Sequence, residues 1–319
     1  MPIVAVTDYT FESLEVERVV LEPLGCRVSA WKDKRPPQEL AQLVADADAV
    51  LTQFAPVNAE VIAAMARARV IVRYGIGVDN VDLEAARARG IPVCNVPDYC
   101  IDEVADHTLA FILAATRQVV TNCLAVRGGS WKLAVPLDRM RTLRELTVGV
   151  VGFGRIGRAV AGRLRPFGCR ILAHDPVVPA AAVEAAGCHP RGLNELLAES
   201  DVVTLHCPST ATTRGMINRA VLGLMKPGVI LVNLARGDLI DSAALTEALQ
   251  RGHVAAAALD VFAPEPIPPD HPVLQMDNVV LAPHIASASV SAAAKLRTTA
   301  ATIAARAIRG EPLPNVVNG

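Results

Sequence analysis

Short runs of apolar and β-branched residues recur through the first hundred positions, at 3–6, 26–30, 49–52, 70–73 and 92–95. Segments with helical spacing lie between them, as at 11–21 and 58–66. Gly25 and Gly90 each stand just before a predicted strand, where a preceding helix commonly ends. This alternation predicts βαβ units and a parallel sheet.

The pattern then changes to one predicted helix that runs from residue 101 to about residue 128. We expect Asp98 to open it and Gly128 with Gly129 to close it. A second series of predicted strands follows, at 147–151, 170–174, 202–206, 229–233, 254–259 and 279–282, before a helical tail at 287–308. The long helix is therefore expected to connect two α/β regions.

Composition supports a folded chain of two domains. The 319 residues correspond to two domains at about 150 residues each. Hydrophobic residues make up 52%, which argues against disorder, and aromatics only 3%, which suits aliphatic strands covered by Ala-rich helices. The net charge of −1, from 31 basic and 32 acidic residues, removes the electrostatic case for a nucleic-acid partner.

Several features indicate a cytoplasmic protein. The longest apolar run, 108–115, is far shorter than the roughly 18 to 20 residues of a membrane span, so no membrane partner is expected. The N-terminus reaches Asp8 without the basic and apolar regions of a signal peptide. Seven cysteines without a CxxC pair predict reduced thiols rather than disulfides or a zinc site.

A glycine-rich turn follows the predicted strand 147–151. Its sequence, Gly152-Phe153-Gly154-Arg155-Ile156-Gly157, has the GxGxxG spacing and opens the predicted helix 155–167. Gly152 permits the tight turn, Gly154 a close approach of a pyrophosphate, and Gly157 close packing of helix and strand. Alone, such a spacing is weak, because tight turns also use glycine.

An acidic residue strengthens this interpretation. The next predicted strand ends at Asp175, 23 residues after Gly152, where a carboxylate can accept hydrogen bonds from both ribose hydroxyls and repel a 2′-phosphate. A surface aspartate beside an ordinary turn is the alternative. The combination predicts a dinucleotide site that prefers NAD to NADP.

The chain resembles the D-isomer-specific 2-hydroxyacid dehydrogenases across nearly its whole length. The matching motifs are RYGIGVDNVD at 73–82, EVADHT at 103–108, LHCP at 205–208, VNLARG at 232–237, LDVF at 259–262, EP at 265–266 and PHI at 283–285. The segment 95–99 looks most like the branch of C-terminal binding proteins and phosphoglycerate dehydrogenase-like enzymes. The resemblance implies NAD-dependent interconversion of a D-2-hydroxy acid and its 2-oxo acid.

The resemblance also implies a catalytic set of Arg236, Glu265 and His284. A histidine can take the hydroxyl proton near neutral pH, and a carboxylate beside it favours its charged form. Arginine can hold the substrate carboxylate with its planar fork. Taken singly, each would more often be a surface or strand-end residue. No pair of histidines has the spacing of the HExxH motif, so no metal is predicted.

Substrate contacts are expected from Tyr74, Gly75, Ile76 and Gly77, together with Arg236 and His284. Successive amides in this glycine-rich loop could hold a carboxylate, although a turn with positive φ would need the same glycines. The rings of Phe54, Tyr74 and Tyr99 are expected to border the pocket. By resemblance, cofactor contacts come from the glycine turn and from Thr108, Asp175, His206, Cys207, Pro208, Thr213, Leu234, Ala235, Arg236, Asp260, His284, Ala286 and Ser287, with Asp260 meeting the nicotinamide carboxamide.

The implied architecture is discontinuous, with two Rossmann-like, doubly wound parallel-sheet domains. A flavodoxin-like substrate domain is expected at 1–100 and 286–319, with the NAD-binding domain, 101–285, inserted into it. A homodimer is expected through residues 101–131. The alternative function is an NAD(H)-sensing binding protein of the C-terminal binding protein type, which Ser287 weakens because that branch carries tryptophan there. The sequence leaves the identity of the 2-hydroxy acid open.

Overall fold

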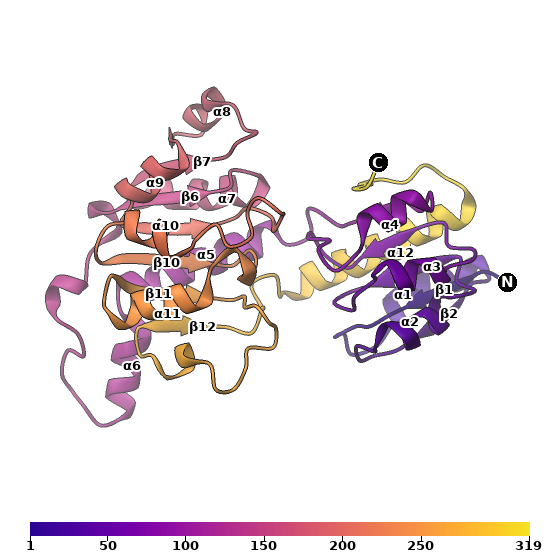
Figure 1. Cartoon of the computed structure of the whole chain (residues 1–319), viewed down its shortest axis with the longest axis horizontal. Coiled ribbons are helices and arrows are strands. Elements are labelled where there is room, and N and C mark those ends of the chain that lie inside the picture. The colour runs from indigo at the N-terminus through magenta and orange to yellow at the C-terminus, as the bar shows by residue number, and fades with distance from the viewer. The chain divides into compact units, whose positions relative to one another are not determined.

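The computed structural model describes all residues from Met1 to Gly319 and divides them into two compact units. Unit 1 comprises Met1–Tyr99 and Ser289–Gly319, and unit 2 comprises Cys100–Ala288. The chain therefore leaves unit 1, builds unit 2 and returns (Figure 1). The expected boundaries differ from these by one to three residues.

Unit 1 is a five-stranded, all-parallel sheet in the order β2-β1-β3-β4-β5, the strand order of flavodoxin-like folds. Its strands are β1 (Ile3–Val6), β2 (Arg27–Ala30), β3 (Ala49–Thr52), β4 (Ile71–Arg73) and β5 (Val93–Cys94). Its helices are α1 (Glu15–Leu21), α2 (Pro37–Val44), α3 (Ala59–Ala64), α4 (Leu83–Ala88) and α12 (Val290–Arg309).

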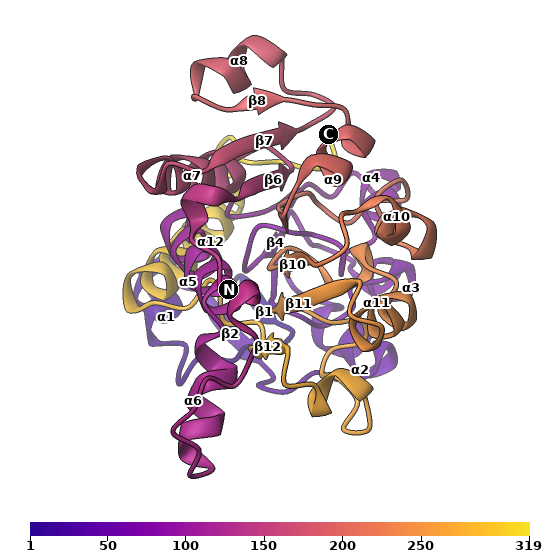
Figure 2. The same cartoon turned by 90° about the vertical axis from the view of Figure 1, so that its left-hand side faces the viewer.

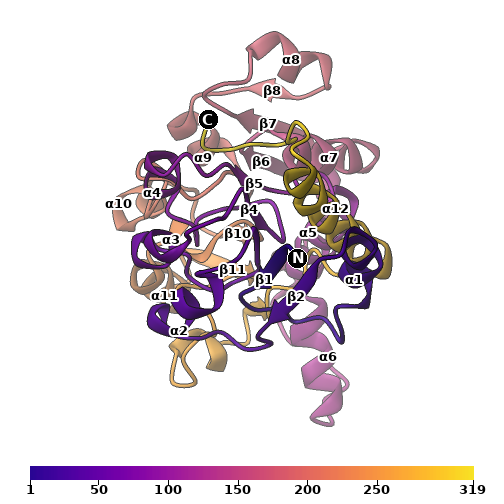
Figure 3. The same cartoon turned by 90° about the vertical axis from the view of Figure 1, so that its right-hand side faces the viewer.

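Both faces of this sheet are covered, which explains why its strands are continuously apolar. Val4 and Val6 belong to the apolar core that includes residues of α1 and α12, whereas Ala5 belongs to the core on the opposite face with residues of α2 and α3. Figure 3 shows α1 and α12 on one side of the strands and α2, α3 and α4 on the other.

Unit 2 is a seven-stranded, all-parallel sheet in the order β12-β11-β10-β9-β6-β7-β8 (Figure 2). Counted within the unit, this is the 3-2-1-4-5-6 order of dinucleotide-binding folds with one further edge strand. Its strands are β6 (Thr147–Val151), β7 (Arg170–His174), β8 (His189–Pro190), β9 (Val202–Leu205), β10 (Val229–Asn233), β11 (Val254–Leu259) and β12 (Val279–Leu281). The expected fold class is confirmed.

The helices of unit 2 cover both faces of its sheet. They are α5 (Ile101–Thr116), α6 (Val119–Arg127), α7 (Arg155–Leu164), α8 (Ala180–Ala185), α9 (Leu193–Glu199), α10 (Arg219–Leu224) and α11 (Ser242–Gln250). The main core joins residues of α9, α10 and α11 to β9, β10 and β11. On α7, Arg163 holds α5 through ion pairs with Asp102 and Asp106.

The expectation of one helix over 101–128 is wrong. The helix breaks after Thr116, and α5 and α6 are bent by 63° relative to each other. Gln118 takes the left-handed conformation (φ 51°), and its side-chain amide donates to the carbonyl oxygen of Ala115. Side chains that bond to nearby backbone compete with helix continuation, and here the break gives α6 its own direction away from the sheet (Figure 2).

Two helix starts also differ from expectation. Cys100, not Asp98, precedes the first turn of α5, and Asp98 instead accepts a hydrogen bond from Lys295 Nζ at 3.0 Å. The C-terminal helix begins at Val290 rather than at residue 287, because Ser289 Oγ caps it by accepting from the N–H of Ala292.

No single helix has the length and apolar composition that a membrane crossing requires; the bent pair α5 and α6 meets that test together.

Candidate active site

The glycine turn in unit 2 is shaped by two close approaches. Gly152 has φ 92°, and a Cβ at this position would lie 2.6 Å from the carbonyl carbon of His206. A Cβ at Gly157 would overlap the carbonyl oxygen of Gly152, so only glycine lets α7 pack this close to the turn. A Cβ at Gly154 would meet nothing within 4 Å, and no side chain caps α7. The N-terminus of α7 therefore has unobstructed space and unsatisfied N–H groups for an anion.

Asp175 follows β7 directly and is fixed by backbone donors. Its Oδ2 accepts from the N–H of Phe153 at 2.8 Å, and its Oδ1 accepts from the N–H groups of Val177 and Val178 at 2.9 and 3.2 Å. The carboxylate also lines an open cavity of about 740 Å³ between the ends of β7 and β8 and the start of α9. A pre-oriented carboxylate on an open cavity can receive further hydroxyl donors.

The loop after β9 carries four of the expected cofactor residues: His206, Cys207, Pro208 and Thr213. Burial lowers the pKa of His206 to about 4, and its Nε2 lies 2.9 Å from Thr204 Oγ1. Burial likewise raises the pKa of Cys207 to about 11, which keeps this thiol protonated and a poor nucleophile. Thr213 Oγ1 donates to the carbonyl oxygen of Pro208 at 2.6 Å and closes the loop.

His284 and Glu265 form a direct pair. His284 Nδ1 lies 2.8 Å from Glu265 Oε2, with 29% and 32% of the two side chains exposed. Burial raises the pKa of Glu265, but the hydrogen bond and charge of His284, the N–H of Phe262 and the charge of Arg236 outweigh it and leave that pKa below its ordinary value. The carboxylate is therefore ionised and holds the imidazole through Nδ1. Glu265 thus engages Nδ1 of the ring and not Nε2.

The backbone of His284 supports a site rather than a packing role. His284 has φ 55°, the left-handed region that non-glycine residues adopt sparingly and that concentrates at functional sites. Its N–H donates to the carbonyl oxygen of Asp260 at 2.8 Å. Hydrogen bonds with neighbouring residues thus hold the backbone of His284 in the left-handed conformation.

Asp260 is the residue expected to meet the nicotinamide carboxamide. It is completely buried, and its Oδ1 and Oδ2 accept from the N–H groups of Ile285 and Ala286 at 2.8 and 2.9 Å. Its carboxylate is used to hold the segment that carries His284. Each of its oxygens accepts one N–H, which leaves acceptor capacity for a further donor such as a carboxamide.

Arg236 follows β10 in a short, well-anchored loop. Asn233 Nδ2 donates to the carbonyl oxygen of Arg236 at 2.8 Å, and Asn233 Oδ1 accepts from the N–H of Ala235 at 3.0 Å. Immediately after it, a Cβ at Gly237 would overlap the carbonyl group of Phe262, whose N–H donates to Glu265 Oε1. The loops of Arg236 and Glu265 therefore touch, and the structure brings the three expected catalytic residues together.

The glycine-rich loop of unit 1 begins at Tyr74, whose ring is 1% exposed and packs edge-on against Phe11. Its hydroxyl donates to Glu17 Oε1 at 3.3 Å. The expectation that this ring borders a pocket is wrong, because the core encloses it; any ligand contact at Tyr74 comes from its backbone. Gly75 has φ 150°, and the side-chain amide of Asn95 donates to the carbonyl oxygen of Ile76.

Other expected cofactor residues vary in exposure. Thr108 is fully buried, with its hydroxyl bonded to the carbonyl oxygen of Val104 at 2.7 Å, so it offers no donor to a ligand. Leu234 and Ala286 are buried, whereas Ala235 and Ser287 are partly exposed. Asp238, which accepts hydrogen bonds from Ser209 and Arg214, was not among the expected residues, because no motif relates these three positions. No cluster of His, Cys, Asp and Glu side chains could hold a metal ion.

Comparison with known proteins places this arrangement in a family. Residues 109–286 match the model described as "D-isomer specific 2-hydroxyacid dehydrogenase, NAD binding domain". The whole chain is 39% identical to D-3-phosphoglycerate dehydrogenase of Mycobacterium leprae, but it spans only 59% of that protein's length.

In two further comparisons the match covers most of this chain and most of the protein compared with it. Glyoxylate reductase of Korarchaeum cryptofilum is 42% identical, over 90% of this chain and 88% of that protein. The structure of D-lactate dehydrogenase from Aquifex aeolicus, complexed with NAD and lactic acid, superposes with a TM-score of 0.86 at 30% identity over 97% of this chain and 96% of that one. The chain belongs to the D-isomer specific 2-hydroxyacid dehydrogenase family.

Proposed function

We propose that this protein is an NAD-dependent dehydrogenase that interconverts a D-2-hydroxy acid and its 2-oxo acid. The observation that carries the proposal is the His284–Glu265 pair, 2.8 Å apart, with the charge of Arg236 acting on the same carboxylate. Proton transfer at the hydroxyl of a 2-hydroxy acid needs an imidazole that takes the proton and a carboxylate that stabilises the charged imidazole. It also needs a cation that binds the substrate carboxylate. The named relatives, dehydrogenases and reductases, do not favour the alternative of a nucleotide-sensing binding protein.

The residues at the glycine turn fit NAD. The uncapped N-terminus of α7 suits the pyrophosphate, and the Asp175 carboxylate suits the ribose hydroxyls while repelling a 2′-phosphate. When bound, NAD supplies the acceptor for the hydride that leaves the substrate. The proposed cofactor contacts are Gly152, Gly154, Arg155, Ile156, Gly157, Asp175, His206, Cys207, Pro208, Thr213, Leu234, Ala235, Arg236, Asp260, His284, Ala286 and Ser287.

In the oxidation direction, His284 Nε2 takes the hydroxyl proton as the C–H bond breaks, and in the reduction direction it returns that proton. The ionised Glu265 stabilises the imidazolium formed and fixes the tautomer through Nδ1. Arg236 holds the substrate carboxylate and polarises the adjacent C2 oxygen. In unit 1, the amides of Ile76 and Gly77 in the loop that follows Tyr74 and Gly75 are proposed as further donors to the substrate carboxylate.

We also propose that two copies associate through residues 101–131 and that the protein acts in the cytoplasm. Helix α6 buries none of its residues, and Val119, Leu124 and Trp131 are 55%, 52% and 89% exposed. Exposed apolar residues gathered on one projecting segment are typical of an interface. The proposal of the cytoplasm rests on the seven cysteines, which contain no CxxC pair.

The test is NADH consumption with a panel of 2-oxo acids of increasing size and charge, including glyoxylate, pyruvate and hydroxypyruvate. We expect at least one acid to turn over at about 1 s⁻¹ or faster, the range of ordinary enzymes. Arg236→Lys should lose most activity, because an ammonium cannot reproduce the bidentate fork. Arg219→Lys, at an exposed position on α10, is the matched control. NADH binding without turnover on every acid would contradict the proposal.

A further inference from the structure

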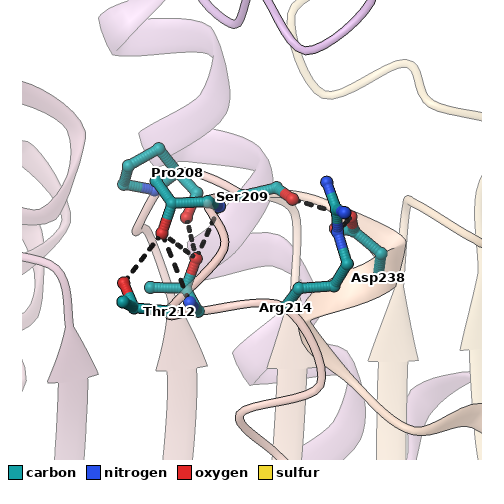
Figure 4. A network of polar contacts seen from close by, with 7 residues as sticks. Pro208, Ser209, Thr212, Arg214 and Asp238 are labelled. Atoms are coloured by element: carbon teal, nitrogen blue, oxygen red, sulfur yellow. Dashed lines mark hydrogen bonds and ion pairs between the residues drawn. The ribbon is translucent and has the colours of Figure 1, made fainter.

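Two loops at the carboxyl edge of the seven-stranded sheet are joined by one side chain. Asp238, in the 3₁₀ turn η5 (Gly237–Leu239), accepts two hydrogen bonds on Oδ2: from Ser209 Oγ at 2.7 Å and from Arg214 Nε at 3.1 Å. Figure 4 shows Ser209 and Arg214 approaching the same carboxylate from the loop after β9. That loop holds proposed cofactor residues, and Asp238 stands two positions after Arg236.

The backbones of the two loops are joined independently of this side chain. The N–H of Gly215 donates to the carbonyl oxygen of Asp238 at 2.7 Å, and the N–H of Ile217 donates to that of Leu239 at 3.0 Å. Ile217 and Ile240 form a parallel bridge. Removal of the Asp238 carboxylate therefore leaves the loops connected, and its effect can be separated from unfolding.

The segment that Asp238 holds is a compact unit of its own. Thr213 Oγ1 accepts from the N–H of Thr210 at 2.8 Å and donates to the carbonyl oxygen of Pro208. Because the segment is closed internally, Ser209 and Arg214 set its position as one piece. Both of them meet Asp238, so the carboxylate adds to the backbone bonds of Gly215 and Ile217 in setting where Pro208 and Thr213 lie relative to η5.

On its other side, η5 contacts the backbone of Phe262, in the loop that carries Glu265. Gly237 packs directly against the backbone of Phe262, whose N–H donates to Glu265. The turn is thus enclosed between the loop after β9 and the loop of Glu265. A displacement of η5 would move Arg236 and the support of Glu265 together.

An ordinary surface ion pair would not carry this role, since such pairs contribute little. Arg214 is 65% exposed and by itself is of that kind. Asp238 differs, because 31% of its side chain is exposed and its Oδ1 is buried without a hydrogen-bond partner. The two donors on Oδ2 therefore offset the desolvation of the carboxylate, and the O–H···O⁻ bond from Ser209 is of the short, charge-assisted type.

We propose that Asp238 is a positioning residue that couples the cofactor-binding loop 206–214 to the catalytic Arg236. The inference rests on the proposed function for the meaning of the two loops. We assign Asp238 no contact with substrate or cofactor; it acts by keeping Pro208 and Thr213 in register with Arg236. A misplacement of about 1 Å is enough to lower turnover substantially.

The experiment compares Asp238→Ala, Asp238→Asn, Ser209→Ala and the Ser209→Ala/Asp238→Ala pair with the wild type. NADH affinity is measured by fluorescence titration of the binary complex, which needs no turnover. The kcat and KM for the accepted 2-oxo acid are measured separately. Arg219→Met, which breaks an ion pair with Glu247 elsewhere in unit 2, is the control.

We expect Asp238→Ala to weaken NADH binding about 5- to 10-fold and to lower kcat about 10-fold, with a melting temperature close to that of the wild type. The double variant should match Asp238→Ala alone, because both changes remove the same contact. Asp238→Asn, which still accepts from Ser209, should recover part of the affinity. The pH profile of kcat/KM should stay that of the wild type, because His284 and Glu265 are untouched.

Wild-type NADH affinity in Asp238→Ala, or additive losses in the double variant, would overturn the inference. A wild type that binds NADH but reduces no 2-oxo acid would instead overturn the proposed function, and the titration would still decide the coupling of Asp238 to the cofactor loop.

Discussion

The two units each pair a glutamate with a basic side chain, and the two pairs differ in what surrounds them. In unit 1, Glu17 and Arg297 have side chains that are 0% and 12% exposed. In unit 2, Glu265 and His284 have side chains that are 32% and 29% exposed. The same type of contact is thus enclosed in one unit and open to solvent in the other.

The Glu17–Arg297 pair in unit 1 has hydrogen-bond partners on both carboxylate oxygens. Arg297 donates from Nε to Glu17 Oε1 at 2.9 Å and from Nη2 to Oε2 at 2.7 Å, and Tyr74 donates to Oε1. The guanidinium also lies over the ring of Phe11, 4.7 Å from its centroid. Burial, followed by the charge of Glu17, raises the pKa of Tyr74 well above its ordinary value. Nothing in this network can exchange a proton with a ligand, so its role is to join α1, α12 and the end of β4.

The Glu265–His284 pair in unit 2 leaves part of both side chains open to solvent. Glu265 contacts only one ring nitrogen of His284, and His284 stands in a left-handed conformation imposed by its neighbours. The difference teaches that a contact between a carboxylate and a basic side chain is typical of function when it is partly exposed and its backbone conformation is unusual. Such a contact is typical of architecture when it is enclosed and hydrogen-bonded on both carboxylate oxygens.

The largest expected effect tests the architectural pair. Arg297→Met leaves the Glu17 carboxylate buried and without its cation, which should lower the free energy of unfolding by about 3 to 5 kcal/mol. Urea denaturation measures it. The matched control, Arg219→Met, breaks a pair in which the arginine is 63% exposed and should cost about 1 kcal/mol or less. Equal losses in the two variants would remove the distinction between enclosed and open pairs.

The second effect tests the contact between the loop that carries Arg236 and the loop that carries Glu265. Gly237→Ala places a methyl group against the carbonyl of Phe262, so Arg236 and Glu265 must move apart. We expect kcat to fall about 100-fold, as for other misplacements of this size. Gly223→Ala, on α10 with no atom within 4 Å of the added carbon, is the control and should keep wild-type turnover. Wild-type kcat in Gly237→Ala would show that the loops need not touch.

The smallest effect concerns His206, whose folded-state pKa is about 4 instead of the ordinary 6.5. Between these values the unfolded chain holds a proton that the folded chain does not, so acidification favours unfolding. The free energy of unfolding should fall by about 2 kcal/mol from pH 6.5 to 4 because of this residue, and less if partial exposure of the ring screens it. His206→Gln should abolish that part of the slope, whereas the exposed His189→Gln should retain it. An unchanged slope in His206→Gln would contradict the burial of the neutral ring.

Much of the fold could be predicted because its strands are buried on both faces and read as unbroken apolar runs. The bounds of β1, β3, β6, β7, β10 and β11 are those expected. The break at Gln118 could not be predicted, because neither glycine nor proline marks it and the left-handed residue is held by its own side chain. The two-residue strand β8 was missed because His189 and Pro190 carry no apolar pattern.

The candidate site, like the fold, could be predicted from the sequence only in part. Motifs identified Arg236, Glu265 and His284, and the structure places them together because the ends of parallel strands meet at one edge of the sheet. The burial of Tyr74, Thr108 and Asp260 could not be predicted, since it depends on side chains from distant segments. Asp238 was missed for that reason too.

The most direct test of the central claim, that the partly exposed pair is catalytic and the enclosed pair architectural, is the turnover of His284→Gln measured together with its free energy of unfolding. The account predicts that kcat/KM falls about 1000-fold, while NADH still binds and the free energy of unfolding stays within about 0.5 kcal/mol of the wild type. Turnover within tenfold of the wild type, or a loss of stability comparable to that of Arg297→Met, would contradict it.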